Sequence, residues 1–582
     1  MEKTLYVRAP AAGRAGPIWR RFELKWVIIA LCVLVVAYLT VMPLIFLVWQ
    51  SFLTPETAGQ ASEFTLDNYA SAYSDPETWH LLSNSLQFSA GTAVFAFLTG
   101  TVLAWMNERT NTPLKSLIFG LSLIPLIIPG MLFVVAWILL LSPKIGMINL
   151  ALQHLFNTDY VFFNIYSMWG MIWVQGLHYS PVAFLFMSSA FRSMDPSLEE
   201  AAMMGGANLW QITSRITLPL TWPAILATLL ILFINAIEAF EGPALQGLPV
   251  GIEVFTSAIY LAIGQYPSQT GLASAYGVLM LVITGVGVYF QTRLSNRSSR
   301  YSTVTGKGFR PRVMDLGRWR YLTSLLFILY FLAIVVLPFL TLLWSSLQRF
   351  YSAPSMKALG ELTLAAYSNL LKDSNLLDAA ANSVFLGLSS ATVIMLLTSV
   401  ICWIVVKTKL PGRWLLDHIA TLPLVFPGVV LGLAIMTFYL QFNVGIYGTM
   451  WIMFIAYLTR FMPYGLRYNT TSMLQMHKDL EESAQMSGAS WGSTFWRIVL
   501  PLLKPGFLAG WIYILIVSIR ELSSSILLYS PDTRVLSIMM WEQWQDGQYV
   551  QLSALGVMLV LVLFFLVMVA RMLGKRVGVK EA

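Results

Sequence analysis

Long apolar stretches recur along the whole chain, and they constrain its fold more than any other feature. A helix needs about 20 consecutive apolar residues to cross the hydrocarbon core of a bilayer. Stretches of this kind predict about twelve spanning helices, with approximate bounds 26–49, 84–106, 116–141, 166–190, 221–244, 272–292, 321–345, 382–406, 415–440, 447–470, 503–528 and 552–573. Only 11% of the 582 residues are charged, against about 25% in an ordinary soluble domain. We therefore expect an all-α polytopic membrane protein.

Basic residues lie mainly on one side of the predicted membrane. The N-terminal tail, residues 1–25, is rich in Lys and Arg, whereas the next loop, 50–83, contains neither and carries several acidic residues. Because cytoplasmic loops are enriched in Lys and Arg, we expect both termini to be cytoplasmic. The net charge of +8 is explained by these loops, and no nucleic-acid partner is expected.

The chain contains an internal repeat. Pro125-x3-Pro129-Gly130 recurs as Pro423-x3-Pro427-Gly428 at an offset of 298, and the offset then falls to 282 from Pro181 and Pro463 onward. The difference predicts a 16-residue insertion in the first half, within 142–165. Parallel repeats of this kind form a translocation path at their interface. Because some secondary transporters share this layout, the repeat alone does not identify the class of transporter.

The repeat and the loops divide the chain into five segments. The segment 294–320 is polar and basic, and it is expected to be a cytoplasmic linker between the halves. The predicted organisation is a tail 1–25, a first half 26–293, the linker 294–320, a second half 321–573 and a tail 574–582.

One loop in each half carries the strongest functional signal. Between the fourth and fifth predicted spans, residues 195–219 share the pattern Glu-(Ala/Ser)-Ala-x3-Gly-x9-Ile-x-Leu-Pro with residues 477–501. Ser197-x-x-Glu200 and Asp479-x-x-Glu482 predict capping boxes that start a short helix. Gly206 and Gly488 suit a chain reversal that needs positive φ. Each loop is thus expected to be a short helix, a turn and a second amphipathic helix on the cytoplasmic face.

The paired pattern resembles the loop with which the permeases of bacterial binding-protein-dependent ABC importers contact their ATPase. The matching positions are Glu200, Ala201, Ala202, Gly206, Ile216 and Pro219 in the first half, and Glu482, Ser483, Ala484, Gly488, Ile498 and Pro501 in the second. Ser483 stands where this motif usually has Ala. Considered alone, the two glutamates could be simple helix caps on interfacial helices, but caps do not explain two copies of the whole pattern.

The resemblance covers nearly the whole chain and implies the type I importer permease fold in each half. It also implies two copies of a cytoplasmic ABC ATPase, a periplasmic or lipid-anchored substrate-binding protein and a location in the bacterial inner membrane. Because no Gly-x4-Gly-Lys-(Ser/Thr) phosphate loop occurs, we expect no enzymatic activity and no bound cofactor in this chain, with ATP and Mg²⁺ on the partner ATPases. A secondary transporter would explain the spans but not the paired loops, and five histidines are too few to suggest a membrane enzyme.

The substrate is less closely defined. Fused permeases with this layout are most similar to ferric-iron importer permeases, and the repeated Pro-x3-Pro-Gly run and Ile519-Arg520-Glu521-Leu522 add to this resemblance. Similar permeases move thiamine, aminoethylphosphonate or another small polar solute, and these remain alternatives.

Ionisable residues inside spans are costly and are therefore candidates for the pathway. The candidates are Glu238, Glu241, Arg520, Glu521, His178 and Arg460. Carboxylates near the outer mouth would suit Fe³⁺, which prefers oxygen ligands, but the metal ligands cannot be identified from the sequence. The alternative is an intramembrane ion pair of Arg520 with Glu238 or Glu241 that holds the halves together.

Overall fold

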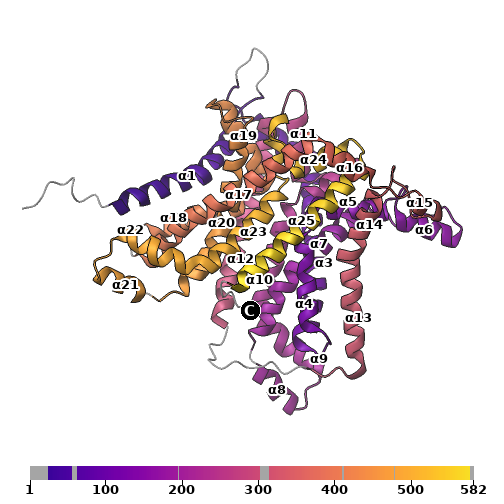
Figure 1. The fold of residues 1–582 in the computed structure, drawn as a ribbon, viewed down its shortest axis with the longest axis horizontal. Coiled ribbons are helices and arrows are strands. Elements are labelled where there is room, and N and C mark those ends of the chain that lie inside the picture. Colours follow the sequence, from indigo (N-terminus) through magenta and orange to yellow (C-terminus); the bar gives the residue numbers. More distant parts are fainter. Residues whose placement is uncertain are drawn as a thin grey trace, which may run out of the picture.

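The computed structural model describes residues 24–55, 62–194, 196–301, 314–408, 410, 412–477 and 479–576. Within these residues the chain is helical, and its only strand pairing is two isolated bridges, Leu53 with Phe64 and Thr110 with Met314. The helices form one elongated body from which single helices extend at the edges (Figure 1). Most of the two predicted tails and the middle of the predicted linker, 302–313, lie outside the described residues.

The first half runs from α1 to α12. Its elements are α1 (Leu24–Gln50), α2 (Asp67–Ser74), α3 (Pro76–Arg109), α4 (Lys115–Leu123), η2 (Ile124–Ile127), α5 (Gly130–Leu141), α6 (Met147–Phe156), α7 (Met168–Arg192), α8 (Pro196–Met204), α9 (Leu209–Ile212), η3 (Thr213–Thr217), α10 (Leu218–Ile237), η4 (Pro243–Gly247), η5 (Leu248–Val250), α11 (Phe255–Gly264) and α12 (Thr270–Tyr301).

The second half repeats this order from α13 to α25. Its elements are η6 (Gly317–Trp319), α13 (Arg320–Phe331), η7 (Leu332–Val336), α14 (Leu337–Ser346), α15 (Met356–Gly360), α16 (Ala365–Lys372), α17 (Ser374–Cys402), η8 (Trp403–Lys407), α18 (Arg413–Thr421), η9 (Leu422–Val425), α19 (Gly428–Gln441), α20 (Met450–Leu474), α21 (Asp479–Met486), α22 (Trp491–Thr494), η10 (Phe495–Val499), α23 (Leu500–Ile519), η11 (Ser525–Leu527), η12 (Pro531–Thr533), α24 (Leu536–Gln545) and α25 (Tyr549–Arg576).

Eight helices of the described chain are long and apolar enough to cross a membrane, and the number is 11 if each of three bent helix pairs is one span. The eight include the first, second, fifth and sixth predicted spans of each half, with shifted ends. The fourth and tenth predicted spans correspond to α7 and α20, which have 25 residues each but are not among the eight. Buried polar residues, including Gln175 in α7 and Asn469 in α20, lower their apolar content.

The third and ninth predicted spans, 116–141 and 415–440, are not straight helices. The chain bends by 96° between η2 and α5 and by 107° between η9 and α19. Pro129 and Pro427 have extended backbone, with ψ of 137° and 142°, at the second proline of each repeated Pro-x3-Pro-Gly run. Proline lacks the N–H that a continuing helix needs, and its ring disfavours helical geometry in the residue before it. The prediction of continuous spans was therefore wrong at these two positions.

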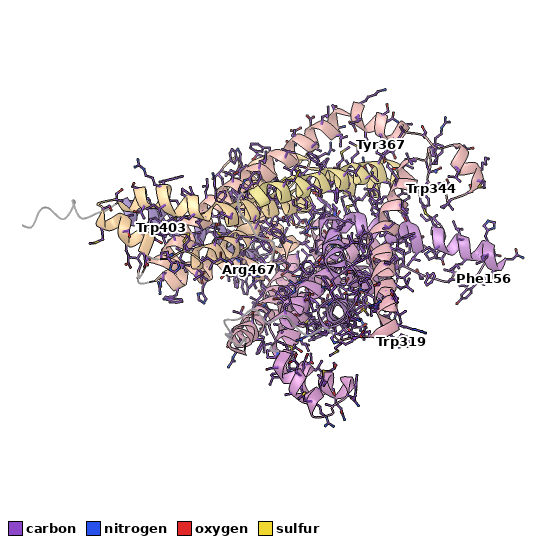
Figure 2. The ribbon with its side chains drawn as sticks, turned by 60° about the horizontal axis from the view of Figure 1, so that its bottom comes forward. Phe156, Trp319, Trp344, Tyr367, Trp403 and Arg467 are labelled. Carbon is purple, nitrogen blue, oxygen red and sulfur yellow. The ribbon has the colours of Figure 1, made fainter. Side chains whose placement is uncertain are left out.

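The segments after α10 and α23 also differ from the prediction. The fifth span ends at Ile237 rather than 244, and the eleventh ends at Ile519 rather than 528. In the first half, a second pair of short helical segments, Pro243–Val250 and Phe255–Gly264, follows with a bend of 73°. The predicted insertion region 142–165 contains the short helix α6, whose last residue, Phe156, lies at the edge of the molecule (Figure 2).

The first helix of each half packs against the other half. α1 contacts α18, α19 and α20, whereas α13 and α14 contact α4 and α5. Hydrogen bonds support this exchange: the Thr459 hydroxyl donates to the Leu39 carbonyl at 3.0 Å, and the Tyr351 hydroxyl donates to the Leu139 carbonyl at 2.9 Å. The two halves are therefore interlocked as well as covalently joined.

Close contact between the second and fourth spans of each half depends on glycine. A Cβ atom at Gly100 of α3 would lie 2.5 Å from the Ser180 carbonyl oxygen of α7. In the second half the glycine is on the opposite helix, because a Cβ at Gly465 of α20 would lie 2.8 Å from Ile394 of α17. Small residues allow membrane helices to approach closely where apolar lipid supplies no hydrophobic driving force.

We predict that Gly100→Ala lowers the free energy of unfolding by about 1–3 kcal/mol, because the new methyl group forces α3 and α7 apart. Thermal unfolding of the detergent-solubilised protein measures the effect. Gly120→Ala is the matched control, since a Cβ added at Gly120 would meet no atom within 4 Å. An equal shift in both variants would contradict the close-packing explanation.

Candidate functional site

The two loops that carry the repeated motif have the same backbone geometry. Gly206 and Gly488 both have φ of +81°, which confirms the predicted left-handed reversal. The amide of Ala207 donates to the Ala202 carbonyl, and that of Ala489 donates to the Ala484 carbonyl, each at 3.0 Å. These bonds satisfy helix-end carbonyls in the manner of a Schellman motif. Figure 1 shows α8 at the bottom of the molecule and α21 at its lower left, so the loops project at separate places.

The helix starts differ from the predicted capping boxes. α8 begins at Pro196 and α21 at Asp479, so Ser197 and Asp479 lie inside the first turn rather than before it. Proline suits the first helical position because its fixed φ matches a helix and its missing N–H would have no partner there. The residues that precede the two helices, 195 and 478, lie outside the described part of the chain.

The second loop helix is continuous with the following span, contrary to the prediction of a separate surface helix. Residues Trp210–Ile237 form one helical segment of 28 residues, as do Gly492–Ile519. Each segment contains a π-helical turn, Thr213–Thr217 or Phe495–Val499. The turn lies next to Pro219 or Pro501, and neighbouring turns of this kind can absorb the hydrogen bond that proline cannot make. A displacement of the loop is therefore transmitted directly to the span.

A buried glutamate anchors the first loop to α3. Glu199 is only 6% exposed, and its carboxylate lies 3.2 Å from the guanidinium of Arg109 at the end of α3. The Thr217 hydroxyl donates to the same carboxylate at 2.8 Å. Arg109 also donates to the Phe191 carbonyl of α7 at 3.0 Å. A single charge pair thus connects the loop to the ends of two spans.

The second loop has an equivalent anchor with different chemistry. Glu481, which is 8% exposed, lies 3.3 Å from Nζ of Lys407. The indole of Trp403 donates to its carboxylate at 3.0 Å, and Lys407 donates to the Met476 carbonyl at 2.8 Å. Figure 2 places Trp403 at the end of the molecule near this loop. Glu199 and Glu481 are equivalent under the repeat, as are Arg109 and Lys407.

The repeated motif predicts a functional role for the neighbouring glutamates, Glu200 and Glu482, and not for these two. Glu200 is half-buried and Glu482 is exposed. The other residues of the motif are either exposed (Ala201, Gly206, Pro219, Ser483, Gly488 and Pro501) or half-buried (Ala202, Ile216, Ala484 and Ile498). The selected residues therefore form an accessible surface, whereas Glu199 and Glu481 hold that surface in place. Both glutamates of each pair recur at the same spacing, and this signal could have revealed the anchors.

We predict that Glu199→Gln lowers the unfolding free energy by about 3–5 kcal/mol, because Arg109 is left buried without its counter-charge. Glu200→Gln, one residue away and half-buried, should change it by less than about 0.5 kcal/mol. Thermal unfolding of the purified protein compares the two variants, and the pair Glu481→Gln and Glu482→Gln repeats the test in the second half. A larger effect of Glu200→Gln would refute the anchoring role.

The predicted pathway residues gather near the ends of α10 and α23. Glu238 and Arg520 directly follow these helices at equivalent positions of the repeat, and His178 and Arg460 are equivalent within α7 and α20. Arg460 is within electrostatic range of Glu238, Glu241 and Glu521. We call these six residues (His178, Glu238, Glu241, Arg460, Arg520 and Glu521) the central charged cluster.

The ion pair within this cluster is not the one predicted. Arg460 pairs with Glu521 at 3.2 Å, and both residues belong to the second half. The backbone N–H and the hydroxyl of Ser524 each donate to the Glu521 carboxylate at 3.0 Å. Arg520 forms no ion pair with Glu238 or Glu241; instead it donates to the Leu126 carbonyl of the first half at 2.6 Å. Arg520 does connect the halves, but through a backbone carbonyl.

The bends of the broken spans lie against this cluster. A Cβ at Gly130 would lie 3.6 Å from the carboxylate carbon of Glu241, and one at Gly428 would lie 2.3 Å from the Arg460 guanidinium. Leu126, which accepts from Arg520, immediately precedes the first bend. A larger residue at 428 would also meet the Ser523 Cβ at 2.7 Å, so that the Arg460 or Ser523 side chain would have to move.

Two members of the cluster keep unused hydrogen-bonding capacity. Glu238 Oε1 and His178 Nδ1 are buried and have no hydrogen-bond partner among the described residues. Buried polar atoms without partners are uncommon in native proteins and call for an explanation. These two atoms lie in the first half, whereas the paired charges Arg460 and Glu521 lie in the second.

We predict that Arg460→Met lowers the unfolding free energy by about 3–5 kcal/mol, because it leaves the buried Glu521 without a counter-charge. Adding Glu521→Gln to this variant should recover much of the loss. A double-mutant cycle of thermal unfolding measures this coupling. Strictly additive losses would contradict the pairing of the two side chains.

Comparison with known proteins defines the class of this chain. The family model described as binding-protein-dependent transport system inner membrane component matches residues 96–300 and 403–579, once in each half and over more than half of the chain. The chain belongs to this family, and it is a membrane-spanning permease of an ABC importer. Membership excludes the secondary-transporter alternative and identifies the chain as a non-enzymatic, multi-pass membrane component.

Curated relatives that align with both halves include ferric transport permeases. Ferric transport system permease protein FbpB of Actinobacillus pleuropneumoniae is 27% identical over 499 residues, which cover 83% of this chain and 70% of that protein. Fe(3+)-transport system permease protein FbpB 2 of Haemophilus influenzae is 23% identical over 507 residues, 86% of this chain and 91% of that protein. Molybdenum transport system permease protein ModB of Escherichia coli K12 is 28% identical, but over only 34% of this chain and 85% of that protein.

One solved structure that aligns with this chain is of a bacterial ABC transporter involved in the import of the acidic polysaccharide alginate. The alignment covers 49% of this chain and 92% of that chain, at 21% identity and a TM-score of 0.35.

Proposed function

We propose that this chain is the permease of an ATP-driven ferric-iron importer and that its two halves form the translocation path. The observation that carries this proposal is the similarity to ferric transport permeases across both halves, over 83% and 86% of the chain. The carboxylates of Glu238, Glu241 and Glu521 add chemical support, because hard cations such as Fe³⁺ prefer oxygen ligands.

A small oxyanion or other polar solute is the second candidate. Arg460 and Arg520 bring two positive charges to the same cluster, and arginine binds phosphate and carboxylate groups well. A relative that covers 44% of this chain is a putative 2-aminoethylphosphonate transport system permease protein of Salmonella paratyphi A. Thiamine is a further alternative for the same importer class. The ferric assignment is favoured because its relatives match both halves together.

In the proposed mechanism, two copies of a cytoplasmic ATPase bind the accessible faces of the loops, 195–219 and 477–501, and both termini lie on that side. ATP and Mg²⁺ are bound by the ATPases, so that this chain needs no cofactor and hydrolyses no ATP. A periplasmic or lipid-anchored binding protein delivers the substrate to the opposite face of the inner membrane. Closure of the ATPases brings the loops together and alternates the access of the path.

The anchors give this coupling a physical route. Movement of the first loop acts on α3 through Glu199 and Arg109, and on α10 through the continuous helix after Gly206. Movement of the second loop acts on η8 through Glu481 and Lys407. At the far ends of α10 and α23, the central charged cluster is positioned to respond. In the Arg460–Glu521 pair, the Glu521 carboxylate is bound to the arginine. If this ion pair opened, Glu521 would be free to contact a cation beside Glu238 and Glu241.

We predict that reversing the charge of both Glu200 and Glu482 to Lys lowers ATP-driven uptake by about tenfold or more, within the range of coupling free energies of 1–3 kcal/mol. Membrane insertion and thermal stability should stay near the wild-type values, because Glu482 is exposed and Glu200 is only half-buried. Uptake by proteoliposomes that contain the permease, its ATPases and the binding protein measures the effect. Unchanged uptake in the double variant would refute the coupling role of these glutamates.

Radiolabelled Fe³⁺ and 2-aminoethylphosphonate, each presented with the cognate binding protein, distinguish the two substrate proposals in the same proteoliposomes. Mass analysis of the solute that co-purifies with the binding protein gives an independent result. Uptake that persists on a proton gradient without ATP would contradict the ATP-driven mechanism itself.

A further inference from the structure

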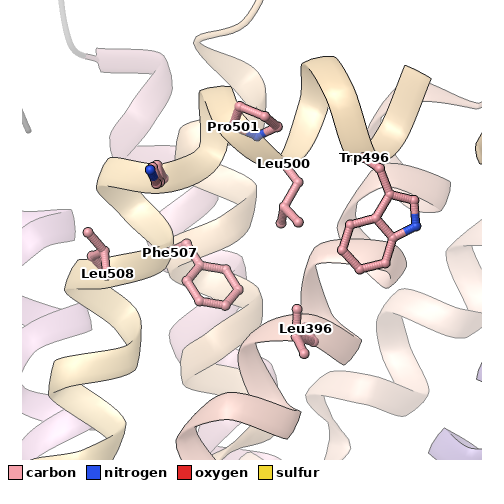
Figure 3. Close-up of a pocket in the computed structure, with 7 residues that line it drawn as sticks. Leu396, Trp496, Leu500, Pro501, Phe507 and Leu508 are labelled. Carbon is pink, nitrogen blue, oxygen red and sulfur yellow. The ribbon is translucent and has the colours of Figure 1, made fainter. Parts of the chain in front are cut away.

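An apolar groove lies where the second loop joins its span (Figure 3). It has a volume of about 320 Å³ and is lined by Leu396 of α17, Trp496 of η10, and Leu500, Pro501, Lys504, Phe507 and Leu508 of α23. Figure 3 shows Trp496 at the right of the groove, Phe507 and Leu508 at its left, and Leu396 below Leu500. The groove is separate from the central charged cluster.

The groove is continuous with the lipid-facing surface of α17. Val384, Phe385 and Leu388 of this helix are exposed apolar side chains, which a bilayer would cover with acyl chains. Leu396 precedes Lys407, the anchor of the second loop, by about 16 Å along the helix. The groove therefore opens toward the leaflet on the loop side of the membrane.

Unpaired positive charge and an aromatic side chain border the groove. Lys504 is exposed, as is Arg497, and neither forms an ion pair with any residue that the structure describes. Trp496 is 63% exposed. Tryptophan prefers the boundary between headgroups and acyl chains, and basic residues in pockets between spans on the cytoplasmic side attract anionic lipid headgroups.

The first half lacks this combination of side chains. Under the offset of 282, Trp496 corresponds to Ser214 and Lys504 corresponds to Trp222. Leu500 and Pro501 are retained as Leu218 and Pro219. Both halves thus have the leucine and the proline, whereas only the second half has a tryptophan and a lysine at these positions.

We propose that this groove binds one anionic phospholipid of the leaflet on the loop side. An acyl chain lies against Leu396, Phe507 and Leu508, and the phosphate lies at Lys504; Trp496 lines the same groove at the boundary between headgroups and acyl chains. Because Trp496 belongs to the second coupling loop, the lipid joins that loop to α17 and stabilises its position. The first loop has no equivalent lipid, so the two loops respond differently to membrane composition.

Native mass spectrometry of the intact permease tests this proposal, with phosphatidylglycerol and phosphatidylcholine of identical acyl chains as the two probes. Wild type should retain phosphatidylglycerol in preference. Lys504→Gln should weaken that binding about fivefold, as expected for one lysine near the membrane surface. Trp496→Ala should weaken it while leaving the charge in place. Lys372→Gln, an exposed lysine beyond the other end of α17, is the matched control and should have no effect.

Equal retention of the two lipids by wild type would overturn the assignment of an anionic headgroup. Unchanged retention of phosphatidylglycerol by Lys504→Gln would overturn the assignment of the site. A loss in Lys372→Gln as large as that in Lys504→Gln would identify a general effect of surface charge and would overturn it as well.

Discussion

The bilayer supplies no water to backbone groups, and this constraint organises the centre of the molecule. Each Pro-Gly break frees carbonyls that must find partners within the protein. The Leu126 carbonyl before the first break accepts from Arg520 at 2.6 Å, and the Val425 carbonyl before the second accepts from the Thr284 hydroxyl at 2.7 Å. In both cases the donor belongs to the other half. The breaks therefore determine where the halves meet and why polar side chains gather there.

Much of the architecture could be predicted from the sequence, because apolar length and an internal repeat report directly on spanning helices. The breaks could not be found in this way, since hydropathy continues unchanged through Pro129 and Pro427. The repeated Pro-Gly pair did indicate the positions of the breaks. Proline disfavours helical geometry in the residue before it, and it lacks the N–H that a continuing helix would need. Helix ends near residues 237 and 519 were misplaced for a related reason, because the apolar composition extends beyond the helices.

The turn at Gly206 and Gly488 could be predicted from the sequence, but the positions of the neighbouring side chains depend on tertiary contacts. Two adjacent glutamates differ by about 100° around a helix, and only the contacts of Glu199 with Arg109 and Thr217 show that Glu199 faces inward and Glu200 does not. The partner of Arg520 could not be predicted either, since its acceptor is a backbone carbonyl some 394 residues earlier in the chain. Pairing of Arg460 with Glu521 depends on how α20 meets the segment after α23.

The exchange of first helices also affects the order in which the protein can be assembled. α1 cannot make all of its contacts until α18, α19 and α20 have been synthesised. Likewise, α4 and α5 lack part of their contacts until α13 and α14 have been synthesised. Individual spans can enter the membrane one after another, but their packing is a later step. During synthesis, the first half must therefore persist as inserted helices with incomplete contacts, and its folding is completed only by the arrival of the second.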